Sequence, residues 1–206
     1  MKPVSILCVS LQCLIVGVAG ASIATFDSLA EGDLGTTFTD AGITFSDLDD
    51  RAGGGPVSFN IERAEGTLSG AGFSAPNALG FGAWVPGPLA AFSQCGSFSF
   101  TNGTVRTFAS IDVFEWMSPA GNTISLEAYR NGVLVNSDSA VIPGNFQINH
   151  WTLKVSGVAF DTLRVNGTGP TDRGIFIGLV DNAVIAPAPA TVVVLLGLVG
   201  LRRRRS

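Results

Sequence analysis

The sequence predicts an all-β protein, with one β-sandwich between two short terminal segments. Many short segments alternate apolar and polar residues, as strands with one buried face do. Turn-formers are frequent, with 26 Gly and 10 Pro among 206 residues. Outside the termini no segment shows the 3.6-residue period of an amphipathic helix. Together, short strands and regular turn signals favour a sandwich over a helical bundle.

Six segments show this alternation, at 57–62, 79–85, 97–100, 123–128, 151–155 and 162–166. Asn131-Gly132 separates two strand-like runs, and both residue types tolerate positive φ, so a tight hairpin is predicted there. Residues 175–185 are almost all apolar except Asp181 and Asn182. This run predicts a central strand that is covered on both faces.

Charge is distributed unevenly along the chain. Lys2 and the four arginines at 202–205 lie in the terminal segments, while all sixteen acidic residues lie between them with the remaining seven basic residues. The central part therefore carries about nine net negative charges. Such a body repels nucleic acid and anionic membranes, so no nucleic-acid partner is predicted. Calcium ions or neutral polymers suit it better.

Residues 1–21 have the layout of a secretory signal peptide. A positive charge at Lys2 precedes an apolar run from about residue 4 to 18, and small residues follow at Ala19, Gly20 and Ala21. Ala19 and Ala21 fit the small-residue pattern of a signal peptidase site. The alternative is a buried or membrane-anchoring helix, which the short run disfavours. Export by the Sec machinery is therefore predicted.

Residues 186–206 have three parts in a fixed order. Pro187-Ala188-Pro189 holds the chain extended, an apolar run follows at 191–201, and Arg202, Arg203, Arg204 and Arg205 end it. As a helix the run would be about 16 Å long, against a bilayer core of about 30 Å. The arginines would hold this end on the cytoplasmic side. The tail thus predicts a transient inner-membrane anchor, with an ordinary membrane anchor as the alternative.

This order of parts resembles the PEP-CTERM sorting signal of bacterial exopolysaccharide-associated proteins, which an exosortase recognises in the inner membrane. The family's usual Pro-Glu-Pro is Pro187-Ala188-Pro189 here. The resemblance implies processing by an exosortase and delivery to the cell surface or extracellular matrix.

The central part, predicted as one domain over 22–185, resembles a family as well, over most of residues 23–185. The stretches ATFDSLAEGDLGTTFTDAGITFS, ISLEAYRNGVLV and VAFDTLRVNG are similar to the jelly-roll domains common in PEP-CTERM proteins. Those domains are similar in turn to carbohydrate-binding sandwiches. The resemblance implies a single antiparallel sandwich of the jelly-roll type, and it supports a fold better than a function.

Residues suited to catalysis are few. His150 is the single histidine, placed just ahead of a predicted strand, and Cys95 is the one cysteine of the central part. No G-x-S-x-G motif is present. The carboxylate pairs Asp112 with Glu115 and Glu62 with Glu65 each straddle a strand, whereas glycoside hydrolysis needs facing carboxylates. The sequence predicts a protein that is not an enzyme, and an uncharacterised hydrolase is the third-ranked function.

Two groups of acids are candidate structural calcium ligands. Asp47, Asp49 and Asp50 crowd a predicted glycine-rich loop, and the alternative is a solvated acidic loop. Asp27 and Asp181 are the second group, because the jelly-roll resemblance implies that the first and last strands meet. A buried Asp181 would need a partner, which calcium, backbone N–H groups or Arg173 would supply.

Trp84 and Tyr129 are the candidate carbohydrate-binding aromatics. Tyr129 shares a predicted polar strand face with Glu127, and Trp84 precedes a proline-rich loop. Trp151 alternates with Leu153 and Val155, which predicts core packing instead. The leading function is a non-enzymatic surface or matrix protein, and the alternative is a carbohydrate-binding module that docks on extracellular polysaccharide.

Overall fold

The structure is a computed structural model that describes residues 20–49, 57–63, 74, 76–83, 93–115, 118–145, 147–170 and 176–187. The predicted signal peptide up to Ala19 and the tail after Pro187 lie outside these residues. Among the described residues, no helix is long and apolar enough to cross a membrane.

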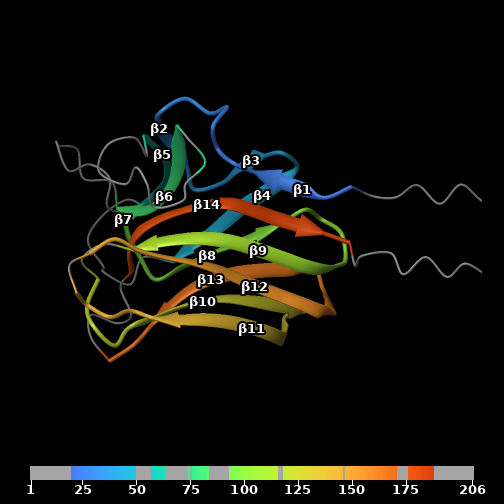
Figure 1. The fold of residues 1–206 in the computed structure, drawn as a ribbon. Helices are drawn as coiled ribbons and strands as arrows, with labels where there is room; N and C mark the ends of the chain where they lie inside the picture. The colour runs from blue at the N-terminus through green and yellow to red at the C-terminus, as the bar shows by residue number, and fades with distance from the viewer. Residues whose placement is uncertain are drawn as a thin grey trace, which may run out of the picture.

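Two antiparallel sheets face each other, as the sequence predicted (Figure 1). The eight-stranded sheet, called sheet A, runs in the order β12 (Asn149–Phe160), β9 (Arg106–Glu115), β14 (Phe176–Ala186), β6 (Asn77–Ala83), β5 (Val57–Arg63) and β2 (Gly32–Gly35), with β1 (Ser22–Ala24) and β7 (Ser93–Cys95) also paired to β14. The six-stranded sheet, called sheet B, runs in the order β11 (Val133–Val141), β10 (Thr123–Arg130), β13 (Thr162–Thr168), β8 (Ser97–Thr101), β4 (Ile43–Asp49) and β3 (Phe38–Asp40). The all-β sandwich of the jelly-roll type is confirmed.

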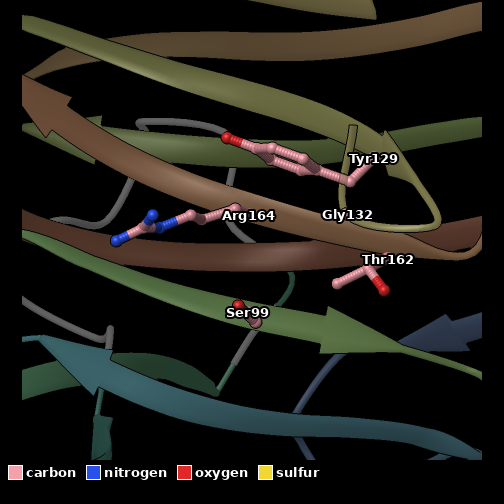
Figure 2. A pocket seen from close by; sticks show the side chains of 5 residues that line it. All are labelled: Ser99, Tyr129, Gly132, Thr162 and Arg164. Atoms are coloured by element: carbon pink, nitrogen blue, oxygen red, sulfur yellow. The ribbon is translucent and has the colours of Figure 1, made fainter. Parts of the chain in front are cut away.

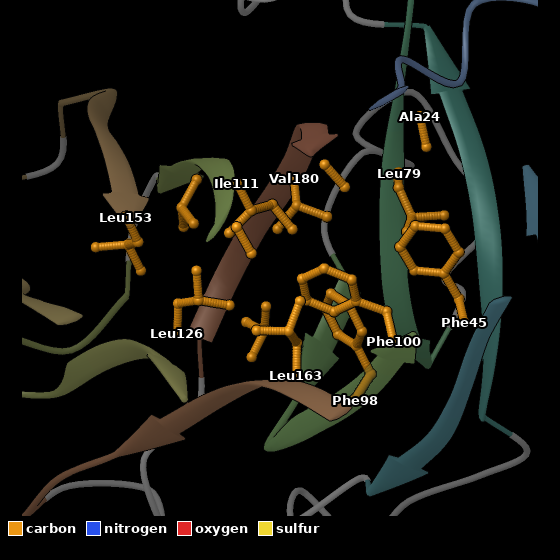
Figure 3. Close-up of a cluster of buried hydrophobic side chains, with 14 of the residues drawn as sticks. Ala24, Phe45, Leu79, Phe98, Phe100, Ile111, Leu126, Leu153, Leu163 and Val180 are labelled. Atoms are coloured by element: carbon orange, nitrogen blue, oxygen red, sulfur yellow. The ribbon is translucent and has the colours of Figure 1, made fainter. Parts of the chain in front are cut away.

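Phenylalanine rings fill much of the space between the sheets. Phe98 is fully buried, with its ring centroid 4.7 Å from that of Phe81 and 5.6 Å from that of Phe59, both edge to face. Phe45 and Phe100 stack at 5.7 Å. Figure 3 shows Phe98 and Phe100 beside the aliphatic side chains that continue the core toward β12. Such aromatic pairs add to the free energy gained by burying apolar surface.

The predicted hairpin joins β10 to β11 at Asn131-Gly132. Both residues have positive φ, 51° and 77°, which is the backbone of a type I′ turn. The turn sets the register, so Tyr129 lies opposite Leu134 and Arg130 opposite Val133. The strand predicted to be central is β14, which pairs with β9 on one side and β6 on the other.

Two details of the sequence prediction are wrong. Ser58, Asn60 and Glu62 alternate with the core residues of β5, yet they are themselves buried, at 9%, 1% and 8% exposure. Alternation shows which side of a strand faces the core but not whether the other side is covered.

Asp47 and Asp49 lie in strand β4, not in a loop, because a bulge between Ser46 and Asp49 keeps this part of the chain paired with β8.

Replacing Phe98 by alanine should lower the free energy of unfolding by about 3–5 kcal/mol, because it leaves a cavity at the centre of the ring cluster. Chemical denaturation of the purified protein measures this loss. Val141→Ala is the matched control, since Val141 is 67% exposed and its truncation should cost less than about 0.5 kcal/mol. Equal losses in the two variants would contradict this account of the core.

Candidate functional site

A hollow of about 220 Å³ opens on the outer face of sheet B. Ser99 of β8, Tyr129 of β10, Thr162 and Arg164 of β13, and Gly132 of the hairpin turn line it (Figure 2). The strand register brings these residues together, since Tyr129 lies opposite Thr162 and Arg164 lies opposite Ser99. Their neighbours Ala128, Leu163, Val165 and Phe100 point into the core. The polar residues therefore point outward from adjacent strands.

Glu127 anchors the aromatic side of the hollow. Its carboxylate accepts hydrogen bonds from the Tyr129 hydroxyl at 2.6 Å, from Asn166 Nδ2 at 2.8 Å and from Ser125 Oγ at 3.2 Å. The bond to Glu127, followed by burial, raises the pKa of Tyr129 above its usual value. The hydroxyl therefore stays protonated and bonded, which fixes the ring along the sheet surface.

Arg164 supplies the positive charge of the hollow. Its Nη2 donates to Ser97 Oγ at 2.5 Å and lies 3.7 Å from Asp49 Oδ2. Figure 2 shows the guanidinium and the Tyr129 hydroxyl directed toward the same end of the hollow. A guanidinium has five N–H donors in a plane, and these two contacts use only Nη2. The Arg164 side chain is 34% exposed, so a ligand in the hollow can reach its guanidinium.

An apolar rim borders the same hollow. Leu134 lies opposite Tyr129 on β11, so the two side chains share a face of sheet B, and Leu134 is 52% exposed. The aromatic ring and the Leu134 side chain form one apolar edge, and the hydroxyls and guanidinium form a polar one. Such a surface suits a rigid ring with one apolar face and hydroxyl groups at its rim.

Of the two predicted carbohydrate-binding aromatics, Tyr129 lines the hollow, while Trp84 lies outside the described residues. Trp151 packs against the core, as predicted. Ser99 and Arg164 were not predicted to be members of the site. Alternation had placed Arg164 on a polar strand face, but nothing local indicated that β8 and β10 flank β13.

The predicted pair Asp27 and Asp181 does come together. Strands β1 and β14 pair, and Asp27 follows β1 in a turn. Asp181 is fully buried and accepts hydrogen bonds from Ser74 N and Oγ, at 2.8 and 2.9 Å, and from Asn182 N at 2.7 Å. Burial, with a smaller contribution from the negative charge of Asp27, raises the pKa of Asp181 to about 7.

Backbone and hydroxyl donors thus partner Asp181, which was one of the alternatives to calcium. Asp27 accepts a hydrogen bond from Asn77 N at 3.1 Å. Within the described ranges, no group of three or more histidine, cysteine, aspartate or glutamate side chains could hold a metal ion. In the other predicted group, Asp47 accepts from Ser46 Oγ, Asp49 faces Arg164, and Asp50 lies outside the described residues. Calcium binding at either group stays a hypothesis.

Three of the candidate catalytic groups, His150, Asp112 and Glu115, make contacts within the protein, while Glu65 lies outside the described residues. His150 lies within β12, not ahead of it, and stacks on Phe114 with ring centroids 4.4 Å apart. Its Nε2 is 3.6 Å from Asp112 Oδ1, which accepts a hydrogen bond from Thr152 at 2.6 Å. Glu115 is 1% exposed and accepts from Ser118 N and Asn149 Nδ2. Asp112 and Glu115 therefore do not form a pair of facing, accessible carboxylates.

Comparison with known proteins finds similarity in fold only. No family model matches the chain, and no curated protein matches it. The adhesin domain of Lys-gingipain from Porphyromonas gingivalis W83 is similar with a TM-score of 0.44 and 10% identity, over 81% of this chain and 98% of that one. The CBM22-1 xylan-binding domain of Paenibacillus barcinonensis Xyn10C has a TM-score of 0.43 and 13% identity, over 81% and 94%. TmCBM61, solved with β-1,4-galactotriose, has a TM-score of 0.40 and 14% identity, over 80% and 94%. These low values carry no information about a ligand of this chain.

Glu62 is a buried carboxyl group on the opposite sheet. It points away from the core of the sandwich, is 8% exposed, and neither of its carboxylate oxygens has a hydrogen-bond partner. Burial without a partner favours the protonated form, and it raises the pKa of Glu62 from 4.5 to about 8. This carboxyl group therefore makes the stability of the fold depend on pH.

As pH rises from about 4.5 to 8, the unfolded chain loses the Glu62 proton while the folded chain keeps it, so folding stability should fall through this window. Glu62→Gln removes the titration and should stabilise the protein above pH 8 by a few kcal/mol, at about 1.4 kcal/mol per pKa unit. Denaturation midpoints of the variant and the wild type at pH 5, 7 and 9 measure this difference in stability. Glu31→Gln, at an exposed acid, should follow the wild-type curve. A Glu62→Gln curve parallel to wild type would contradict the burial of this carboxyl.

Proposed function

We propose that this is an exported matrix or cell-surface protein whose sandwich binds extracellular polysaccharide at the hollow on sheet B. The observation that carries the proposal is the position of the Tyr129 ring. Glu127 fixes this ring beside the hydroxyls of Ser99 and Thr162 and the guanidinium of Arg164. A pyranose presents apolar C–H groups on its face and hydroxyls at its rim, which matches an aromatic surface bordered by hydrogen-bonding groups.

The site is prepared before a ligand arrives. Tyr129 and Arg164 both have hydrogen-bonded partners that restrict their rotamers. Binding would therefore cost little side-chain entropy, which favours affinity from a small contact area. The proposal includes no catalytic step, because the candidate acids Asp112 and Glu115 are engaged in contacts within the protein.

The two terminal segments support the rest of the proposal. A signal peptide over 1–21 would direct export by the Sec machinery, and the segment 186–206 would hold the chain briefly at the inner membrane for an exosortase. The protein would then reach the cell surface or the exopolysaccharide matrix. A polysaccharide-binding sandwich would retain it there after its tail is removed.

Replacing Tyr129 by alanine should weaken polysaccharide binding at least about tenfold, because the aromatic ring supplies the apolar contact. Affinity electrophoresis of the full-length chain in mild detergent, in gels that contain single polysaccharides, measures this change. Tyr129→Phe keeps the ring and should retain most of the binding.

Val141→Ala is the matched control, since Val141 is exposed on the same sheet and does not line the hollow. Thermal unfolding of each variant separates loss of binding from loss of fold. Unchanged migration of a folded Tyr129→Ala variant would exclude the hollow as the binding site. No retardation of the wild-type chain by any polysaccharide would reject the proposed function.

The intact mass of the native protein should lack residues 1–21 and the stretch after Pro189, because a signal peptidase and an exosortase would remove them. Mass spectrometry of protein recovered from the envelope and medium of the source cell measures this. A mass that retains the apolar run and the four arginines would argue for a stable anchor and against exosortase processing.

A further inference from the structure

The charges around the hollow differ from those of a surface built for acidic polymers. Among the described residues, the outward-pointing side chains of β4, β8, β13 and β10 include one cation, Arg164. Asp49 lies 3.7 Å from its Nη2, so a carboxylate of the protein already sits beside this charge. A guanidinium that is paired in this way attracts an incoming anion weakly.

Two further carboxylates lie on the same face. Glu127 holds the Tyr129 hydroxyl at 2.6 Å, and Asp47, which is exposed, accepts a hydrogen bond from Ser46 on β4. With Asp49, these acids outnumber the one cation, so the formal charge of the face is negative. Carboxylate or sulfate groups on a polymer would be repelled as it approached the ring.

The remaining outward residues offer hydroxyl groups. Ser99 and Thr101 on β8 and Thr162 on β13 are partly exposed, whereas Ser97 and Ser125 are buried and bonded within the protein. Hydroxyls both donate and accept hydrogen bonds, as the hydroxyls of an uncharged sugar do. The face can therefore exchange hydrogen bonds with a neutral sugar chain without adding charge.

From this arrangement we infer that the ligand is a neutral polysaccharide and that acidic polysaccharides are excluded. The inference rests on the proposed function and specifies its ligand class. The three acids, the paired Arg164 and the partly exposed hydroxyls carry it. Because binding would not depend on charge attraction, it should change little with salt concentration.

The experiment compares polymers that share a backbone and differ in charge. The full-length chain, in mild detergent with EDTA, is run in gels that contain one member of each pair: hydroxyethyl cellulose or carboxymethyl cellulose, methyl-esterified or free polygalacturonic acid, and xylan or glucuronoxylan. Retardation by a neutral member, at least about fivefold stronger than by its acidic partner and nearly constant between 20 and 300 mM NaCl, is the expected result.

A charge-reversing variant tests the cause. Asp49→Lys should strengthen binding of the acidic members at 20 mM NaCl several-fold, since it removes a repelling carboxylate and leaves Arg164 without this partner. Glu31→Lys is the matched control, because it makes the same charge change at an exposed position beside β2 of the other sheet and should have no such effect.

Stronger retardation by an acidic member than by its neutral partner would overturn the inference but leave the proposed function standing. A preference for an acidic member that appears only when calcium replaces EDTA would also overturn the inference. Calcium would then bridge the carboxylates of the protein and those of the polymer. If Asp49→Lys and Glu31→Lys strengthened the binding of acidic polymers equally, the net charge of the protein, not the charge of this face, would decide which polymer binds. Retardation by no polymer would refute both the inference and the proposed function.

Discussion

The packing of phenylalanine rings between the two sheets is the contact on which the rest of the structure depends. Phe98 and Phe100 of β8 point inward against Phe45, Phe59 and Phe81 from both sheets. Since side chains alternate along a strand, burying these two rings forces Ser97 and Ser99 outward. The same constraint on β13 buries Leu163 and Val165 and turns Thr162 and Arg164 out. The hollow is therefore positioned by the core beneath it.

The outer faces of the two sheets carry polar residues in different environments. On sheet A, Glu62 and Asp181 are buried, and burial raises the pKa of both. On sheet B, Glu127 accepts three hydrogen bonds and Arg164 contacts Ser97 and Asp49. Polar groups with partners stay in place at an open surface, whereas an unpartnered buried carboxyl costs stability when it ionises. This difference favours sheet B as the binding surface and sheet A as the source of pH sensitivity.

Features set by local interactions were predictable from the sequence. The Asn131-Gly132 hairpin follows from the ease with which these two residues adopt positive φ, and the strand that became β14 is recognisable from its run of apolar residues, which only Asp181 and Asn182 interrupt. The burial of Ser58 and Asn60 was not predictable, because it depends on what covers the strand. Arg164 and Ser99 were also missed as partners of Tyr129, since 35 and 30 residues separate them from it along the chain.

By itself, the sequence determined the alternation of the strands, the hairpin and the inward or outward direction of most side chains. It also determined the acidic charge of the central part. These properties depend on neighbouring residues or on composition. Tertiary structure alone decided that β10, β13 and β8 lie side by side, and so that Tyr129, Arg164 and Ser99 share one hollow. Strand order arises from pairing between segments that lie far apart in the chain. The entropic cost of closing a long loop depends only weakly on the loop's length, so this cost does not select one pairing partner over another.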